Sequence, residues 1–244
     1  MLRPLLALLA AGLLLAGCGS GSNSPSSDQE PGSSPQPSVD VPSTQSEPVL
    51  PDLSGAAGER LRQEVARADE EKMNPEVFAK VGDSNTEWPQ NIYGLGCREV
   101  GYGSNGDLRT VVARYSKVKF PDLAGLPGCS PVNSLTRRSA AAVSGVWTEW
   151  LMTPTADLPA TGIAPPTDEC EPQQTPLECE IELIRPRWAL IMSGTNDALL
   201  GLPLGATYKR ELGKMIDRVR QLGPVPVLST LPPMAVPAHN GQPG

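Results

Sequence analysis

The segment from residue 187 to residue 230 constrains the fold of this chain more than any other part of its sequence. Residues 187–193 are almost wholly apolar and run into Gly194-Thr195-Asn196-Asp197, as expected for a strand buried on both faces of a parallel sheet. Thr207 can cap the helix that follows, and Gly223-Pro224 can end it before another strand at residues 225–230. One face of that helix carries apolar side chains at helical spacing: Tyr208, Leu212, Met215, Val219 and Leu222. This βαβ pattern predicts an α/β three-layer sandwich with a parallel sheet.

An earlier strand of the same sheet is predicted at residues 77–81, which run into Gly82-Asp83-Ser84. The roughly one hundred residues that follow, up to residue 187, are rich in Gly, Pro and Ser. A bare loop of that length is uncommon in a compact domain. We therefore expect at least a strand and a helix in it, near residues 109–115 and 138–151.

Residues 52–74 predict a charged helix of about four turns ahead of this domain, which itself extends over residues 75–244. Leu61, Val65 and Ala68 form the apolar stripe of the helix, and Asn74-Pro75 ends it.

The first residues indicate export. Arg3 and the eleven apolar residues 5–15 are typical of a secretion signal over residues 1–17, too short to span a bilayer. Leu15-Ala16-Gly17-Cys18 resembles a bacterial lipobox, whose cysteine is lipidated; the alternative is an ordinary cleaved signal with a chance cysteine. We expect acyl chains on Cys18 to hold the protein at the bacterial cell membrane, on its extracytoplasmic side.

A disordered tether is predicted over residues 18–51. Residues 19–51 hold ten Ser, seven Pro and three Gly, with no aromatic and no basic residue. Such a segment buries too little apolar surface to offset its chain entropy.

The net charge of the whole chain, −7, argues against nucleic acid and acidic lipid as partners.

Four cysteines remain once Cys18 is assigned to lipid, and three disulfide pairings are possible. We favour Cys170–Cys179, which closes a short proline-containing loop, and therefore Cys97–Cys129. A zinc site is the rival interpretation, but no C-x-x-C pair occurs and His239 is the single histidine, so we expect no metal.

The two turns that follow the predicted strands are candidates for a functional site. Ligands of open parallel sheets bind at the carboxyl ends of the strands, so one edge should receive both Gly82-Asp83-Ser84 and Gly194-Thr195-Asn196-Asp197. Each sequence alone is an ordinary turn. Their joint occurrence, each directly after an apolar strand, is much less ordinary.

On these residues the chain resembles the SGNH hydrolases, or GDSL esterases and lipases, over about residues 75–233. Val81-Gly82-Asp83-Ser84 is similar to the first sequence block of that family, residues 191–197 to the third, and residues 139–147 more loosely to the second. The resemblance implies a flavodoxin-like fold without a cofactor, and Ser84 as the nucleophile. It also implies an oxyanion hole made by the amides of Ser84 and Gly145 and the carboxamide of Asn196.

These residue types suit ester hydrolysis. A serine hydroxyl needs a neighbouring base to take its proton, and attack on the carbonyl creates an oxyanion that such donors stabilise. Asp83 is interpreted as a turn-bonding residue rather than a catalytic acid.

The last block of the family, an Asp and a His three residues apart, has no counterpart here. His239 has no preceding Asp in its segment, so we interpret it as an exposed tail residue, with catalytic base as the rival role. We therefore expect a C-terminally incomplete domain with weak or no hydrolysis.

Two functions follow. The first is a lipid-anchored serine hydrolase of small acyl esters, acetylated glycans among them. The second is an inactive surface-binding lipoprotein of the same fold, and an in-frame Asp-x-x-His in the coding DNA beyond Gly244 would favour the enzyme.

Elsewhere, we expect Trp147 and Trp150 in the core and Arg137-Arg138 at a solvated corner.

Overall fold

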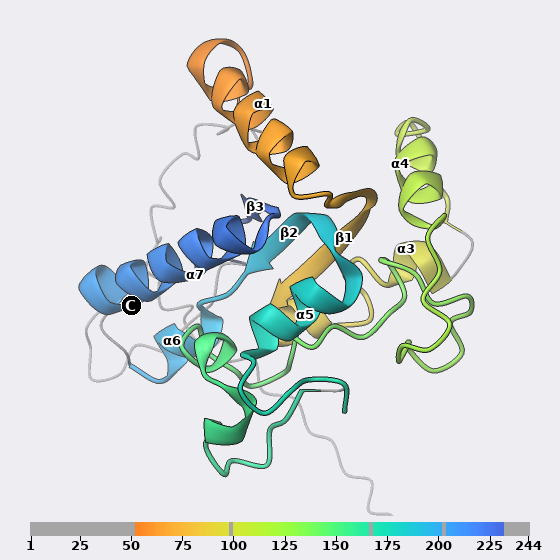
Figure 1. The fold of residues 1–244 in the computed structure, drawn as a ribbon. Helices are drawn as coiled ribbons and strands as arrows, with labels where there is room; N and C mark the ends of the chain where they lie inside the picture. Colours follow the sequence, from red (N-terminus) through yellow and green to blue (C-terminus); the bar gives the residue numbers. More distant parts are fainter. Residues whose placement is uncertain (1–51, 98–99, 166–167, 202–203, 232–244) are drawn as a thin grey trace, which may run out of the picture. The chain divides into compact units, whose positions relative to one another are not determined.

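The computed structural model describes residues 52–97, 100–165, 168–201 and 204–231, all within the unit of the chain formed by residues 50–244. Three parallel strands make one sheet in the order β1-β2-β3 (Figure 1). The strands are β1 (Asn74–Gly82), β2 (Pro186–Met192) and β3 (Val225–Leu228). The predicted α/β class and the parallel sheet are confirmed.

The described residues also form seven α-helices, and three of them have only four or five residues. They are α1 (Gly55–Glu70), α2 (Ser84–Glu87), α3 (Gly94–Cys97), α4 (Leu108–Tyr115), α5 (Pro176–Ile184), α6 (Thr195–Leu199) and α7 (Lys209–Leu222).

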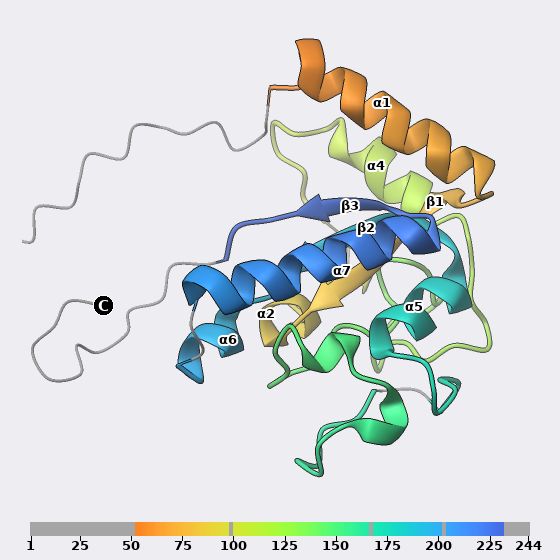
Figure 2. The same cartoon turned by 60° about the vertical axis from the view of Figure 1, so that its left-hand side comes forward.

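Helices cover both faces of the sheet: α1 and α4 lie on one side, and α5 and α7 on the other (Figure 2). Side chains alternate along a strand, so β1 contributes to both layers. Val77, Ala79 and Val81 are fully buried in the main core with α5 and α7. Phe78 points the other way and meets the ring of Tyr115 on α4 edge-on, with 5.0 Å between ring centroids.

Helix α1 uses the predicted stripe. Leu61, Val65 and the buried Ala68 pack in a small cluster that includes Val225 of β3. The expected end near Asn74-Pro75 was wrong, because the helix stops at Glu70 and Asn74 already begins β1.

Helix α7 ends as predicted and begins differently. Gly223 caps its carboxyl end at a φ of 112°, a conformation that favours glycine. Thr207 does not cap the helix, because it lies inside a π-helical turn, Leu204–Tyr208, that runs directly into α7. Strand β3 is shorter than predicted and ends at Leu228.

The long connection between β1 and β2 holds two helices: α4, where a strand was expected, and α5, which was missed. Thr175 caps α5, since its side chain accepts a hydrogen bond from the amide of Glu178, whose carboxylate in turn accepts one from the amide of Thr175. The sequence Thr-Pro-x-Glu at residues 175–178 is the local pattern that indicates this capping box. Residues 138–151 form no regular strand or helix before a 3-10 turn begins at Trp150, contrary to expectation.

Both expected disulfides are confirmed. Cys97 is bonded to Cys129 within the long connection, and Cys170 to Cys179 at the start of α5.

Candidate functional site

The two candidate turns leave the sheet side by side. β1 and β2 pair in register up to their last residues, where Gly82 lies opposite Met192. Beyond the strands, the side-chain amide of Asn85 donates to Thr195 Oγ1 at 2.9 Å and joins one turn to the other. The predicted convergence at one sheet edge is therefore confirmed.

Only glycine fits at position 82. A Cβ there would lie 2.0 Å from the carbonyl oxygen of Met192 and 2.3 Å from Thr86 Oγ1, far inside van der Waals contact. Thr86 uses this proximity, since its hydroxyl donates to the same carbonyl at 3.1 Å. The close approach of the backbones brings the first turn against β2.

The first turn presents Ser84 at the start of α2. Asp83 is fully buried and caps that helix, accepting a hydrogen bond from the amide of Asn85 at 2.9 Å, which agrees with its interpretation as a turn-bonding residue. Ser84 is half-buried, and its hydroxyl has no hydrogen-bond partner among the described residues. The predicted nucleophile is thus accessible but not activated by any group in this part of the chain.

A third segment, residues 139–146, reaches the same edge. The amide of Gly82 donates to the carbonyl of Ala141 at 2.8 Å, and the amide of Val143 donates to Gly82 at 3.2 Å, so the segment follows the free edge of β1. Asn196 Nδ2 donates to the carbonyl of Val146 at 2.7 Å. Gly145, next to that carbonyl, has a φ of 84° and is exposed. The structure therefore brings the segments that carry Ser84, Asn196 and Gly145 to one place.

A buried carboxylate fixes this segment from the other side. Asp197 accepts hydrogen bonds from the amide and the hydroxyl of Thr148, both at 3.1 Å. The same hydroxyl lies 3.0 Å from Ser193 Oγ, and all three side chains are buried. Asp197 therefore has a structural partner within the site.

Tyr208 closes the second turn. Its hydroxyl donates to the carbonyl of Ser193 at 2.6 Å, and a Cβ at Gly194 would lie 2.7 Å from the hydroxyl oxygen. Burial, followed by the negative charges of Asp197 and Asp83, raises the pKa of Tyr208, so the phenol remains a donor at neutral pH. In the sequence, Tyr208 is recognisable only as part of the apolar face of a helix.

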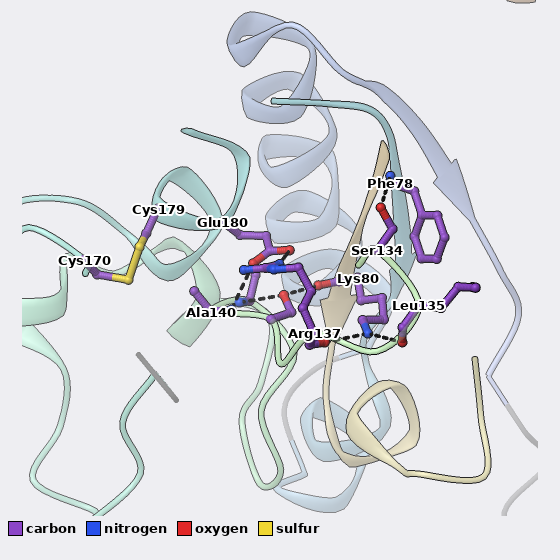
Figure 3. A network of polar contacts seen from close by, with 11 residues as sticks. Phe78, Lys80, Ser134, Leu135, Arg137, Ala140, Cys170, Cys179 and Glu180 are labelled. Atoms are coloured by element: carbon purple, nitrogen blue, oxygen red, sulfur yellow. Dashed lines mark hydrogen bonds and ion pairs between the residues drawn. A yellow bond between two sulfur atoms is a disulfide. The ribbon is translucent and has the colours of Figure 1, made fainter. Parts of the chain in front are cut away.

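A buried ionic cluster lies behind the third segment (Figure 3). Arg137 pairs with Glu180 of α5, and Lys80 of β1 lies beside them; their exposed fractions are 2%, 0% and 1%. The interpretation of Arg137 as part of a solvated corner was wrong. Its partner Glu180 lies 43 residues away, on helix α5, which was not expected from the sequence.

This cluster fixes the path of residues 135–140. Lys80 Nζ donates to the carbonyls of Leu135 at 3.0 Å and Arg137 at 2.8 Å, while Glu180 accepts from the amide of Ala140 at 3.0 Å (Figure 3). Burial, and then the charge of Arg137, lower the pKa of Lys80 well below its usual value, although Glu180 acts in the opposite direction. The segment that continues to Gly145 is thus attached to β1 and α5 by charged and backbone groups.

Two predicted functional residues, Cys18 and His239, lie outside the described residues. Within the described ranges, no helix is both long and apolar enough to span a bilayer, and no group of three His, Cys, Asp or Glu side chains is placed to hold a metal ion. Trp150 is fully buried in the main core and Trp147 packs against it, as expected.

Comparisons with known proteins found no family model, no curated protein and no solved structure that matches this chain.

Proposed function

We propose that this chain is an exported, lipid-anchored serine hydrolase that cleaves carboxylic esters through an acyl-enzyme on Ser84, and that its sheet belongs to an SGNH-type, flavodoxin-like fold. One observation supports the proposal above the others. A free serine hydroxyl, a half-buried carboxamide and an exposed glycine in the left-handed conformation come from three separate segments to the carboxyl edge of two paired strands. Such edges are where α/β proteins bind ligands.

The reaction would proceed by addition and elimination. Ser84 Oγ forms a bond to the ester carbonyl carbon, its proton passes to a base, and the carbonyl electrons move onto oxygen. When this oxyanion collapses, the bond to the alcohol breaks and the alcohol takes the proton. Water then attacks the acyl-enzyme in the same way and releases the acid. The candidate base is His239, the single histidine of the sequence; if it is only an exposed tail residue, the chain keeps weak or no hydrolysis.

Asn196 is suited to stabilise the oxyanion. A carboxamide nitrogen has two N–H groups, and Asn196 uses one of them on the carbonyl of Val146. That bond holds the side chain in place and leaves the second N–H for the substrate. Donors positioned before the reaction are the effective ones, because no reorganisation is needed when charge develops.

A second function, that of a non-catalytic binding protein, is favoured by the surroundings of Ser84. Among the described residues no ionisable group forms a hydrogen bond with its hydroxyl, and Asp197 is engaged with Thr148. A serine without a base keeps only the small rate that binding and the oxyanion hole supply. On this alternative the same edge binds a ligand without cleaving it.

Labelling with a fluorophosphonate separates the two functions. The reagent bonds irreversibly to an activated serine, so even weak activation accumulates into a measurable adduct where turnover is slow. We expect an adduct on Ser84 in the full-length protein, none in Ser84→Ala, and slower labelling in His239→Ala. Absence of the Ser84 adduct, while a control esterase is labelled, would leave the binding protein as the function.

The anchor is tested separately from the chemistry. In bacterial cells fed an alkyne fatty acid, the wild-type chain should acquire the label and remain with the membrane fraction. Cys18→Ser should lose both properties. A Cys18→Ser variant that is labelled like the wild type would exclude this cysteine as the lipid attachment site.

A further inference from the structure

An exposed tryptophan stands beside the candidate site. Trp88 directly follows α2, the helix that begins with Ser84, and 59% of its surface is accessible to solvent. The other three tryptophans, Trp147, Trp150 and Trp188, pack against buried clusters. An indole in water at this position leaves a broad apolar face without a partner.

Trp88 is one wall of a groove of about 320 Å³. Glu87, Arg138 and Ser144 form its polar part, and Pro89 and Pro127 extend its apolar part. The two prolines also line an adjoining depression of about 300 Å³, so the groove continues away from the site. Each volume lies in the range of small-molecule sites, about 300 to 1,000 Å³.

The polar part of the groove is held rigidly. One carboxylate oxygen of Glu87 accepts from Arg138 at 3.1 Å, and the other accepts from the amide of Ser144 at 2.7 Å. Burial acts to raise the pKa of Glu87, but the hydrogen bonds from Ser144 and Arg138 outweigh it and lower that pKa, so the carboxylate is charged at neutral pH. Ser144 adjoins Gly145, which places this end of the groove next to the proposed oxyanion hole.

We propose that this groove binds a neutral saccharide, with the C–H face of a sugar ring stacked on Trp88 and its hydroxyls bonded to Glu87 and Arg138. This proposal rests on the proposed function, because the saccharide bound in the groove would be the glycan part of an acylated ester substrate. Glu87 keeps free lone pairs for hydroxyl donors, and Arg138 uses one of its five N–H groups on a described partner. A sugar ring has the apolar face and the mixed donors and acceptors that this surface requires.

The other ligand classes fit this groove less well. A hydrocarbon chain would remove water from the Glu87–Arg138 pair and offer no hydrogen bond in its place, at a large cost in desolvation. An anion would face the charged Glu87 in a protein whose net charge is −7. A proline-rich peptide docks in grooves lined by several aromatic residues, whereas Trp88 is the one aromatic residue in this lining.

Calorimetric titration of the full-length Ser84→Ala protein tests the saccharide groove, because binding there does not need the serine hydroxyl. The probes are cellotetraose, xylotetraose, tetra-N-acetylchitotetraose and a proline-rich decapeptide. We expect at least one sugar to bind. Adding Trp88→Ala should weaken that binding about tenfold or more, since truncation of a tryptophan at a contact is among the most costly changes. Leu108→Ala, on the exposed side of α4, is the matched control and should bind as the parent does.

The outcomes separate this proposal from the esterase proposal. Failure of all three sugars to bind, unchanged binding after Trp88→Ala, or binding of the peptide alone would overturn the saccharide groove. None of these results affects the fluorophosphonate adduct on Ser84, which is measured on protein that retains the serine. Conversely, sugar binding without any adduct would keep the groove and remove the esterase. Thermal unfolding of each variant confirms that a loss of binding is not a loss of fold.

Discussion

Replacing Glu180 by glutamine should be among the most destabilising single changes in the sheet domain. The substitution preserves the size of the side chain but removes the charge that neutralises Arg137. Glu180 and Arg137 have exposed fractions of 0% and 2%, so solvent cannot stabilise a charge that loses its partner. Removing one partner of a buried ion pair leaves an uncompensated charge, which costs about 3 to 5 kcal/mol. In a domain of this size that corresponds to a fall in Tm of roughly 6 to 20 °C.

Urea unfolding followed by circular dichroism, with the disulfides intact, measures this cost. The matched control is Glu59→Gln in the pair Arg62–Glu59, whose side chains are 69% and 58% exposed, respectively, and it should change the unfolding free energy by less than about 1 kcal/mol. Replacing both buried partners by methionine should restore much of the stability, because no unpaired charge then remains. A Glu180→Gln variant as stable as the control variant, or a double variant less stable than the single one, would show that losing the Glu180 charge does not leave Arg137 as a costly unpaired charge.

Three further changes test other parts of the structure. Gly82→Ala should lower the unfolding free energy by about 3 kcal/mol or more, because its Cβ would lie 2.0 Å from the backbone oxygen of Met192; an unchanged urea midpoint would contradict this close approach. Because the pKa of Lys80 is lowered in the folded protein, the unfolded chain binds up to one more proton than the folded one between that lowered pKa and 10.5. Stability should therefore rise with pH across this interval, by up to about 1.4 kcal/mol per pH unit. Lys80→Met should remove that slope from urea titrations run at several pH values, and an identical slope in both proteins would show that Lys80 is charged when folded. Asn196→Ala should slow fluorophosphonate labelling of Ser84 about 10²-fold while costing about 1 kcal/mol of stability, and equal labelling rates would exclude Asn196 as an oxyanion donor.

The strands and the turns between them could be predicted because their signals are local. An apolar run such as residues 187–193 indicates a buried strand from its own composition. Because β1 and β2 are parallel, the turns that follow them must then meet at one edge of the sheet. The disulfides were predictable for a similar reason, since the short loop between Cys170 and Cys179 left Cys97 and Cys129 as the second pair.

The errors involve contacts between distant parts of the chain. Two adjacent arginines suggest a solvated corner, and nothing near Arg137 in the sequence indicates that Glu180 will bury and neutralise it. Residues 138–151 run along β1 as an almost irregular segment. Two backbone hydrogen bonds with Gly82 and one from the amide of Ala140 to the Glu180 carboxylate hold it there, in place of the continuous hydrogen-bond ladder of a strand. Helix α5 did have a readable signal, the capping box of Thr175 and Glu178, and recognising it would have offered Arg137 a partner.

A crystal structure of the fluorophosphonate adduct would show whether Ser84, Gly145 and Asn196 act on one substrate oxygen. We expect a phosphorus atom bonded to Ser84 Oγ, with its oxygen about 2.7 to 3.1 Å from Asn196 Nδ2 and from the amide nitrogen of Gly145. An adduct whose oxygen contacts solvent alone, with Asn196 and Gly145 directed away from it, would contradict this expectation.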